Sequence, residues 1–226
     1  MKKLKNKLLD ILLLPVRLHD GLTDRRATLI AGIVVVGAID FLGTDVKYTM
    51  ALTRELFFGK LVPDIVYNAS MAVLVLLMLG LVDVICTCVP LFDISRYFKR
   101  KEAQFIANTG IKAGEQEPPV RPTAARVMKV YILSHFLIVP VSMILNYVFS
   151  LDFIDKSSPI VQNLLLVVYM LIMVWGAAVL TRGINAIFRF NVLFRRFIFL
   201  VVFTWQFIFG MVFDILIINW LMQLFR

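Results

Sequence analysis

The sequence predicts an all-α fold: a polytopic membrane protein with a five-transmembrane-helix bundle and an N-terminal amphipathic surface helix. Two observations support this prediction. Of the 226 residues, 60% are hydrophobic and only 17% are charged, which is too apolar for a soluble domain of this length. The apolar residues also gather in five long segments, and the loops between them alternate between rich and poor in Lys and Arg.

A helix that crosses about 30 Å of hydrocarbon needs about 20 residues, and five stretches are long enough. They make up one membrane domain over residues 27–226. The expected spans cover residues 27–44, 64–92, 130–149, 159–181 and 197–223. The connection between the third and fourth spans is short, so we expect a tight hairpin loop there.

The basic loops predict the orientation of the chain. Residues 1–26, 91–129 and 182–196 carry 7, 8 and 4 Lys and Arg residues, which leaves 5 of the 24 for the other side. Basic loops stay in the cytoplasm. We therefore expect a multi-pass protein of the cell membrane with its N-terminus in the cytoplasm and its C-terminus outside. Anionic headgroups account for the net charge of +9, so no nucleic-acid partner is expected.

Residues 1–26 are expected to form an amphipathic cytoplasmic segment, because four apolar residues between Leu4 and Leu12 share one helical face. Such a helix lies in the plane of the headgroups, and a solvated tail is the alternative. Pro15 ends or bends the helix, and His19 is expected at the interface. The side chains expected to contact lipid headgroups are Lys2, Lys3, Lys5, Lys7, Arg189, Arg195 and Arg196.

The longest expected cytoplasmic loop covers about residues 93–126 and is too short to form an independent domain. Pro119 and Pro122 give it a PxxP spacing that favours extended polyproline II structure. A linker is the simpler interpretation of this loop, and a protein partner could also dock there.

Polar groups inside the spans are costly in hydrocarbon, and they normally face the bundle or a wet cavity. Counted from the inner boundaries, Asp83 is expected at a depth of about 14 Å and His135 at about 8 Å. These two side chains are therefore expected to interact. The pair is either proton-sensitive or a hydrogen bond that only joins two helices. The polar intramembrane candidates are Asp40, Asp83, His135, Asn146, Gln206 and Asp214.

Two further carboxylates are expected nearer the outside, Asp40 at about 21 Å and Asp214 at about 26 Å from the inner boundary. In one apolar pocket they would share a proton or hold a cation. Alternatively, water near the outer interface solvates each of them separately. Gly37 and Gly210 each lie one turn from a carboxylate, so both helices are expected to approach a neighbour closely. Close packing is also expected at two small-residue faces, Ala27, Ala31 and Ala38 in the first span and Gly176, Ala177 and Ala178 in the fourth, and these faces could equally form a homo-oligomer.

Three stretches carry a resemblance to a known family: ILLLPVRLHD at 11–20, TAARVMKVYILSHFLIVP at 123–140 and LLLVVYMLIMVWGAAVLTRGINAIFRF at 164–190. Together they resemble the bacterial Yip1 family of integral membrane proteins, which implies five spans. The chain departs from the family in its spacing between Tyr131 and Pro140. It also lacks the soluble N-terminal region and the Asp-Leu-Tyr-Gly-Pro-type motif of the eukaryotic members linked to Rab binding. The resemblance therefore implies the architecture and not a Rab partner.

No catalytic or metal-binding motif is evident in the sequence. Cys86 and Cys88 diverge by about 200° on a helix, which disfavours a disulfide between them. There is no HExxH motif and no P-loop, and no cofactor is expected. We expect a non-catalytic membrane scaffold or adaptor. A channel, permease or transport accessory that uses Asp83/His135 and Asp40/Asp214 is the alternative, and an intramembrane enzyme comes last.

Overall fold

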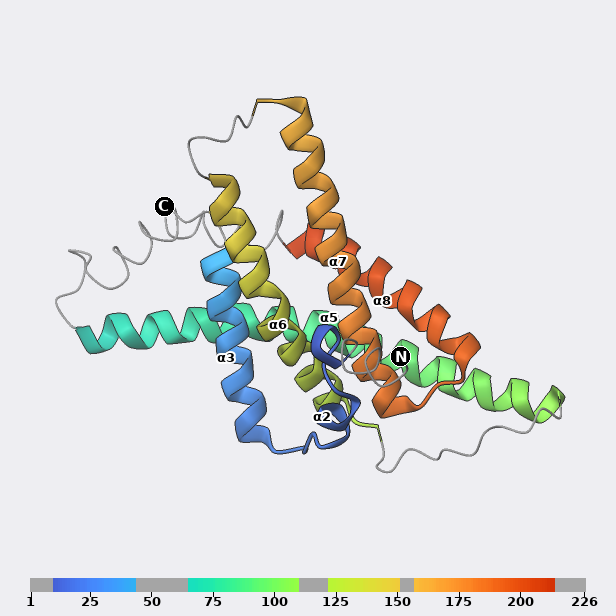
Figure 1. Ribbon diagram of the computed structural model, residues 1–226. Coiled ribbons are helices and arrows are strands. Elements are labelled where there is room, and N and C mark those ends of the chain that lie inside the picture. The colour runs from blue at the N-terminus through green and yellow to red at the C-terminus, as the bar shows by residue number, and fades with distance from the viewer. Residues whose placement is uncertain (1–9, 44–64, 110–121, 151–156, 214–226) are drawn as a thin grey trace. The chain divides into compact units, whose positions relative to one another are not determined.

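The computed structural model describes residues 10–43, 65–109, 122–150 and 157–213, and in these ranges it contains helices and no strands. Figure 1 shows their arrangement. The labelled helices are α2 (Val16–Asp20), α3 (Arg26–Gly43), α5 (Ile65–Thr109), α6 (Ala124–Ser150), α7 (Pro159–Phe188) and α8 (Val192–Val212).

Four stretches in the described ranges are long and apolar enough to cross a membrane: Val73–Thr109, Ala124–Phe149, Pro159–Phe188 and Val192–Val212. They correspond to the second to fifth expected spans. The all-helical, multi-pass membrane bundle is therefore confirmed. Helix α3, with 18 residues, covers almost the range expected for the first span but is not among these four, so a fifth crossing stays a prediction. Residues 1–9 lie outside the described ranges, and the N-terminal surface helix stays a prediction as well.

The helices run beyond the expected spans on the side of the basic loops. Residues 93–109, which we expected to begin a loop, continue α5 to Thr109. The loop expected at 182–196 shrinks to residues 189–191, because α7 ends at Phe188 and α8 begins at Val192. Hydropathy marks only the residues that suit hydrocarbon, whereas backbone hydrogen bonding propagates a helix into the headgroup layer and water.

The chain divides into two compact units. The first unit contains residues 1–24 and 88–207, and the second contains residues 25–87 and 208–226. Helices α5 and α8 contribute residues to both units.

The apolar core of the first unit gathers at one end of its helices. We call this part the basic end: the end of α5, the start of α6, the end of α7 and the start of α8. In Figure 1, α6 and α7 run side by side and α2 lies against α7. Large side chains that are almost completely buried here are Val130, Leu180, Ile184, Phe188, Phe190 and Ile198. The first half of α7 is instead exposed, with Ile160 79% and Leu171 63% accessible, as expected for residues that face lipid.

Glycines bring α6 and α7 close together. A Cβ on Gly176, which we expected in a close helix contact, would lie 3.2 Å from Cδ1 of Ile138. The tighter contact is at Gly183, where a Cβ would lie 2.2 Å from Cγ1 of Val130. A larger residue at position 183 would therefore push the two helices apart.

Candidate functional site

In the second unit, α3 and α5 cross at two glycines. A Cβ on Gly37 would lie 1.8 Å from the carbonyl oxygen of Leu76, and one on Gly80 would lie 2.0 Å from the carbonyl oxygen of Ile33. These distances leave no room for any side chain. The backbone contact between the helices therefore depends on both glycines, as in other small-residue helix packing in membranes.

This crossing brings two carboxylates together. Asp40 and Asp83 each follow a crossing glycine by three residues, so each lies about one helical turn from the contact. Their nearest carboxylate oxygens lie within 4.8 Å of one another. Asp83 is only 4% exposed, and Thr87 Oγ1 donates a hydrogen bond of 3.5 Å to Asp83 Oδ1.

The pair can share a proton or hold a cation, and cation binding would use carboxylate oxygens as ligands. Asp40 and Asp83 were expected in different pairs, because counting depth along each span assumes that every span is perpendicular to the membrane. The signal that could have found this pair is the repeated GxxD spacing, Gly37 to Asp40 and Gly80 to Asp83.

The other intramembrane candidates within the described residues lie in the first unit. His135 lies on α6 of the first unit, with its ring edge-on to Tyr131 at 4.4 Å between centroids. Asp83 belongs to the second unit, so the Asp83–His135 pair stays a prediction. Gln206 is half-buried on α8. The side chain of Asn146 and the whole of Asp214 lie outside the described residues, and the Asp40–Asp214 pair also stays a prediction.

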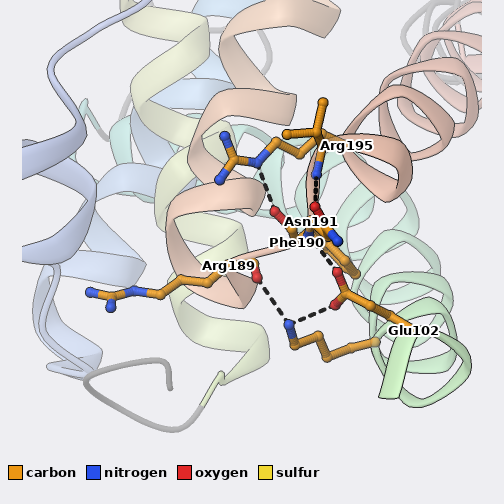
Figure 2. Close-up of polar contacts among 7 residues, drawn as sticks. Glu102, Arg189, Phe190, Asn191 and Arg195 are labelled. Atoms are coloured by element: carbon orange, nitrogen blue, oxygen red, sulfur yellow. Dashed lines mark hydrogen bonds and ion pairs between the residues drawn. The ribbon is translucent and has the colours of Figure 1, made fainter. Parts of the chain in front are cut away.

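At the basic end of the first unit, Glu102 organises a polar network. Its side chain is 2% exposed and accepts a bond of 2.6 Å from Lys99 Nζ. It also accepts a bond from the backbone N–H of Asn191, and Lys99 Nζ donates to the carbonyl oxygen of Arg189 at 2.9 Å. Figure 2 shows the Glu102 carboxylate facing the turn between α7 and α8. A buried carboxylate with these partners fixes the turn to the end of α5.

The turn itself, residues 189–191, has all its carbonyl groups bonded. Besides the bond to Arg189, the carbonyl oxygen of Phe190 accepts from Arg195 Nε at 2.7 Å and that of Asn191 accepts from the Arg195 N–H at 3.0 Å. Arg189 ends α7 in the left-handed region, with φ 50°. Asn191 Oδ1 accepts from the N–H of Val192 at 2.6 Å, which satisfies a free donor at the start of α8.

Aromatic contacts anchor this network in the core. Phe190 is 1% exposed and stacks on Phe188 with 5.6 Å between ring centroids. Phe188 also packs on Phe92 of α5 at 5.9 Å, and Lys99 Nζ lies 5.6 Å from the centroid of the Phe190 ring. We call Lys99, Glu102 and the turn 189–191 the Glu102 network.

The Glu102 network leaves several basic side chains exposed around it. Arg195 and Arg196 are exposed, as expected for headgroup contacts, whereas Arg189 is half-buried. In Figure 2 the Arg189 guanidinium points away from Glu102. Exposed apolar residues accompany them on α8, with Val192 62% and Phe197 49% accessible. Such mixed basic and apolar surfaces suit the boundary between headgroups and acyl chains. Lys2, Lys3, Lys5 and Lys7 lie outside the described residues.

A second polar region of the first unit involves residues 10–24, which we call the N-terminal segment. On α7, Arg182 forms an ion pair with Asp10, and Trp175 Nε1 donates to the carbonyl oxygen of Leu12 at 2.6 Å. Leu14 adopts φ 61°, in the left-handed region, and α2 begins directly after Pro15.

The end of the N-terminal segment is bonded to α6 and the residue before it. Thr123 Oγ1 donates to Asp24 Oδ1 at 2.6 Å, and Arg126 Nε lies 3.6 Å from the same oxygen. Lys129 Nζ donates to the carbonyl oxygen of Thr23. The segment thus contacts the basic end of the first unit at both of its ends.

His19 lies in the N-terminal segment and is 1% exposed, so its side chain is buried within the protein, and its expected depth at the membrane interface stays a prediction. A Cβ on Gly183 would lie 3.2 Å from its Cε1, and this close approach buries the ring against α7. Among the described residues, neither ring nitrogen has a hydrogen-bond partner. Burial, with Arg182 as the second cause, lowers the pKa of His19 to about 4, although Asp20 opposes the shift. The ring is therefore neutral at pH 7.

Sequence reasoning missed both Glu102 and the role of the N-terminal segment. A signal for Glu102 was present, because it is the only acidic residue between Asp93 and Glu115 and lies among basic residues. An isolated acid on a basic helix is a candidate for a buried partner. The contacts of Asp10 and Asp24 had no such signal, since their partners are more than 90 residues away.

Comparison of the chain with protein-family models, with curated proteins and with solved structures finds no match. The resemblance to the Yip1 family therefore depends on the three stretches quoted above. Function has to be argued from the residues and their geometry.

Proposed function

We propose that this protein is a non-catalytic scaffold or adaptor of the Yip1 type in the cell membrane. It has five spans, a cytoplasmic N-terminus and an external C-terminus, and its basic end binds anionic lipid headgroups. The observation that carries this proposal is the Glu102 network, which gives the α7–α8 turn a fixed backbone beside exposed arginines.

A fixed turn favours headgroup binding for an entropic reason. Binding by a mobile loop would have to order its backbone, whereas residues 189–191 already have their carbonyl groups bonded. Glu102 offsets the charge of Lys99, so the charge available to an anionic headgroup comes mainly from Arg195 and Arg196. Their apolar neighbours Val192 and Phe197 would lie against the acyl chains.

The end of α5 extends the same basic surface. Arg96, Arg100 and Lys101 are exposed on this helix, within the region where we expect a protein partner. A partner with an acidic surface, or a second copy of the chain in a homo-oligomer, would complete the scaffold function. Neither role requires a catalytic residue or a cofactor.

The proposal is tested by counting bound anionic lipids. The protein is placed in nanodiscs of phosphatidylcholine with phosphatidylglycerol, and native mass spectrometry then measures the phosphatidylglycerol that stays bound. Each Arg near the surface contributes about 1 kcal/mol, so Arg195→Gln with Arg196→Gln should weaken binding by about 30-fold.

The matched control is Lys47→Gln with Lys60→Gln, which removes the same charge from the connection expected outside the membrane. This control variant should bind as much phosphatidylglycerol as the unchanged protein. Equal loss of lipid in both double variants, or in neither, would contradict a headgroup site at the α7–α8 turn.

A second candidate function is a channel, permease or transport accessory, and the close approach of Asp40 and Asp83 favours it. A shared proton or a bound cation between these carboxylates would be a step on a polar route through the bundle. Proteoliposomes loaded with a pH-sensitive dye test it. Proton or sodium flux that Asp83→Asn abolishes would favour transport over the scaffold, and the absence of flux in the unchanged protein would exclude transport of these two ions.

A further inference from the structure

We infer that the N-terminal segment occupies a phosphate-binding site formed by Arg126, Lys129 and Arg182, and that an anionic phospholipid displaces it. This inference rests on the proposed function, since it requires the basic end to lie in the headgroup layer. It adds a second lipid site, on α6 and α7, which is closed by the chain itself.

Each of the three cations is held by an oxygen of the N-terminal segment. Arg182 pairs with the Asp10 carboxylate, and Arg126 pairs with the Asp24 carboxylate. Lys129, only 7% exposed, donates to a backbone carbonyl oxygen of the same segment. The segment therefore presents two negative charges and a neutral acceptor to the cations, and the oxygens of a phosphodiester could replace them.

The positions of the cations suit a lipid phosphate. Arg126 and Lys129 lie in the first two turns of α6, and Arg182 lies in the last two turns of α7. Both helices are long and apolar enough to cross a membrane. Cations at the ends of such helices lie at the depth of the headgroups, where Arg binds phosphate through two parallel hydrogen bonds.

The contacts of the N-terminal segment are of a kind that can be exchanged. The side chains of Asp10 and Asp24 are 45% and 47% exposed, and water weakens ion pairs of this kind. The Glu102 carboxylate, in contrast, is 2% exposed, so water does not compete for its bonds to Lys99 and the turn. The basic end therefore combines a fixed turn with an exchangeable segment.

The segment also contains two unfavourable features. His19 is buried, and among the described residues its ring nitrogens have no hydrogen-bond partner, so docking removes its bonds to water without replacing them. Leu14 is held in the left-handed region, which is strained for a leucine. Both features are relieved when the segment leaves its site, and they reduce the binding energy that a competing phosphate must supply.

Hydrogen exchange of the intact protein in nanodiscs tests this inference. The amides of Leu18, Gly21 and Leu22 are hydrogen-bonded within the docked segment and report on its release. Exchange in this region should be at least 5-fold faster in discs with phosphatidylglycerol than in discs of phosphatidylcholine alone. The amide of Arg195 on α8, which donates to the carbonyl oxygen of Asn191 in the fixed turn, should exchange equally in both lipids.

Three variants complete the experiment. Asp10→Asn with Asp24→Asn should release the segment in phosphatidylcholine as well. The single variant Asp93→Asn, which removes an exposed charge from α5, should behave like the unchanged protein. Arg182→Gln with Lys129→Gln should abolish the difference between the two lipids.

Two results would overturn the inference. One is equal exchange of the segment in the two lipids for the unchanged protein. The other is release of the N-terminal segment by inorganic phosphate in phosphatidylcholine discs, with the phosphate charge matched to that of the phosphatidylglycerol in the first experiment. That result would assign the site to a soluble anion. If the segment does not respond while the α7–α8 turn still retains phosphatidylglycerol, this inference fails and the proposed function stands.

Discussion

Acidification should release the N-terminal segment, because His19 is buried and its ring nitrogens have no hydrogen-bond partner within the part of the chain that the structure describes. In the docked segment its pKa is about 4, and in the released segment it returns to the ordinary value of 6.5. Between these two values the released state binds a proton that the docked state does not bind. Docking is therefore unaffected above pH 6.5, weakens as the pH falls through 6.5, and reaches its full loss near pH 4.

The size of the effect follows from this window. At pH 5 the pH lies about 1.5 below the His19 pKa of the released state. Protonation then stabilises the released state over the docked state by about 2 kcal/mol, which is about a 30-fold shift toward release. The charged groups that act on His19 are Arg182 on α7 and Asp20 on its own helix.

Hydrogen exchange at pH 7.5 and pH 5 measures this release, after correction for the chemical exchange rate at each pH. The bonded amides of Leu18 and Gly21 should exchange about 30-fold faster at pH 5 than at pH 7.5. His19→Leu fills the same space without a titrating group, so its segment should stay docked at both pH values. The reasoning is refuted if the unchanged protein shows no difference between the two pH values, or if His19→Leu shows the same difference.

Three further predictions follow from the helix contacts and the buried charges. Glu102→Gln removes the negative charge that accepts hydrogen bonds from Lys99 Nζ and the Asn191 N–H. The variant should therefore have a free energy of unfolding lower by about 1–3 kcal/mol, measured by melting in detergent. Lys101→Gln on the exposed face should change it little, and equal melts would contradict the role of the network. Gly80→Ala places a Cβ 2.0 Å from a backbone carbonyl and should lower the melting temperature far more than Gly176→Ala, which meets only a flexible Ile138 side chain. Asp83→Asn should keep the fold and remove the infrared band of a protonated carboxyl, whereas an unchanged band would exclude a proton shared between Asp40 and Asp83.

The span ends beside the basic loops illustrate the limit of predicting helix bounds from hydropathy. Composition located the four described spans, but it ended them where polar residues begin, as at Asp93 and Thr181. The helices continue because backbone hydrogen bonding does not depend on hydropathy. This difference changed the expected structure of the region, since a loop at 182–196 became a three-residue turn that Glu102 holds.

The polar residues show the same limit. Asp40 and Asp83 were recognisable as candidates because a carboxylate in an apolar span is expensive. Their partners were not recognisable from depth alone, since the crossing at Gly37 and Gly80 determines which carboxylates meet. His19 resembled an interfacial residue because it lies among polar neighbours in the sequence, and only the packing of α2 on α7 shows that it is buried.

The sequence by itself determined the class of this protein, because the need to satisfy the backbone in hydrocarbon makes long apolar segments helical without reference to any partner. It also determined where charge is concentrated, through the distribution of Lys and Arg between loops. Only the tertiary structure decided which charges meet. The contacts of Asp10 with Arg182 and of Glu102 with Asn191 join residues 172 and 89 positions apart, and no local pattern encodes a pairing over that distance. Such contacts depend on how the helices pack, which small residues such as Gly183 permit and large residues would prevent.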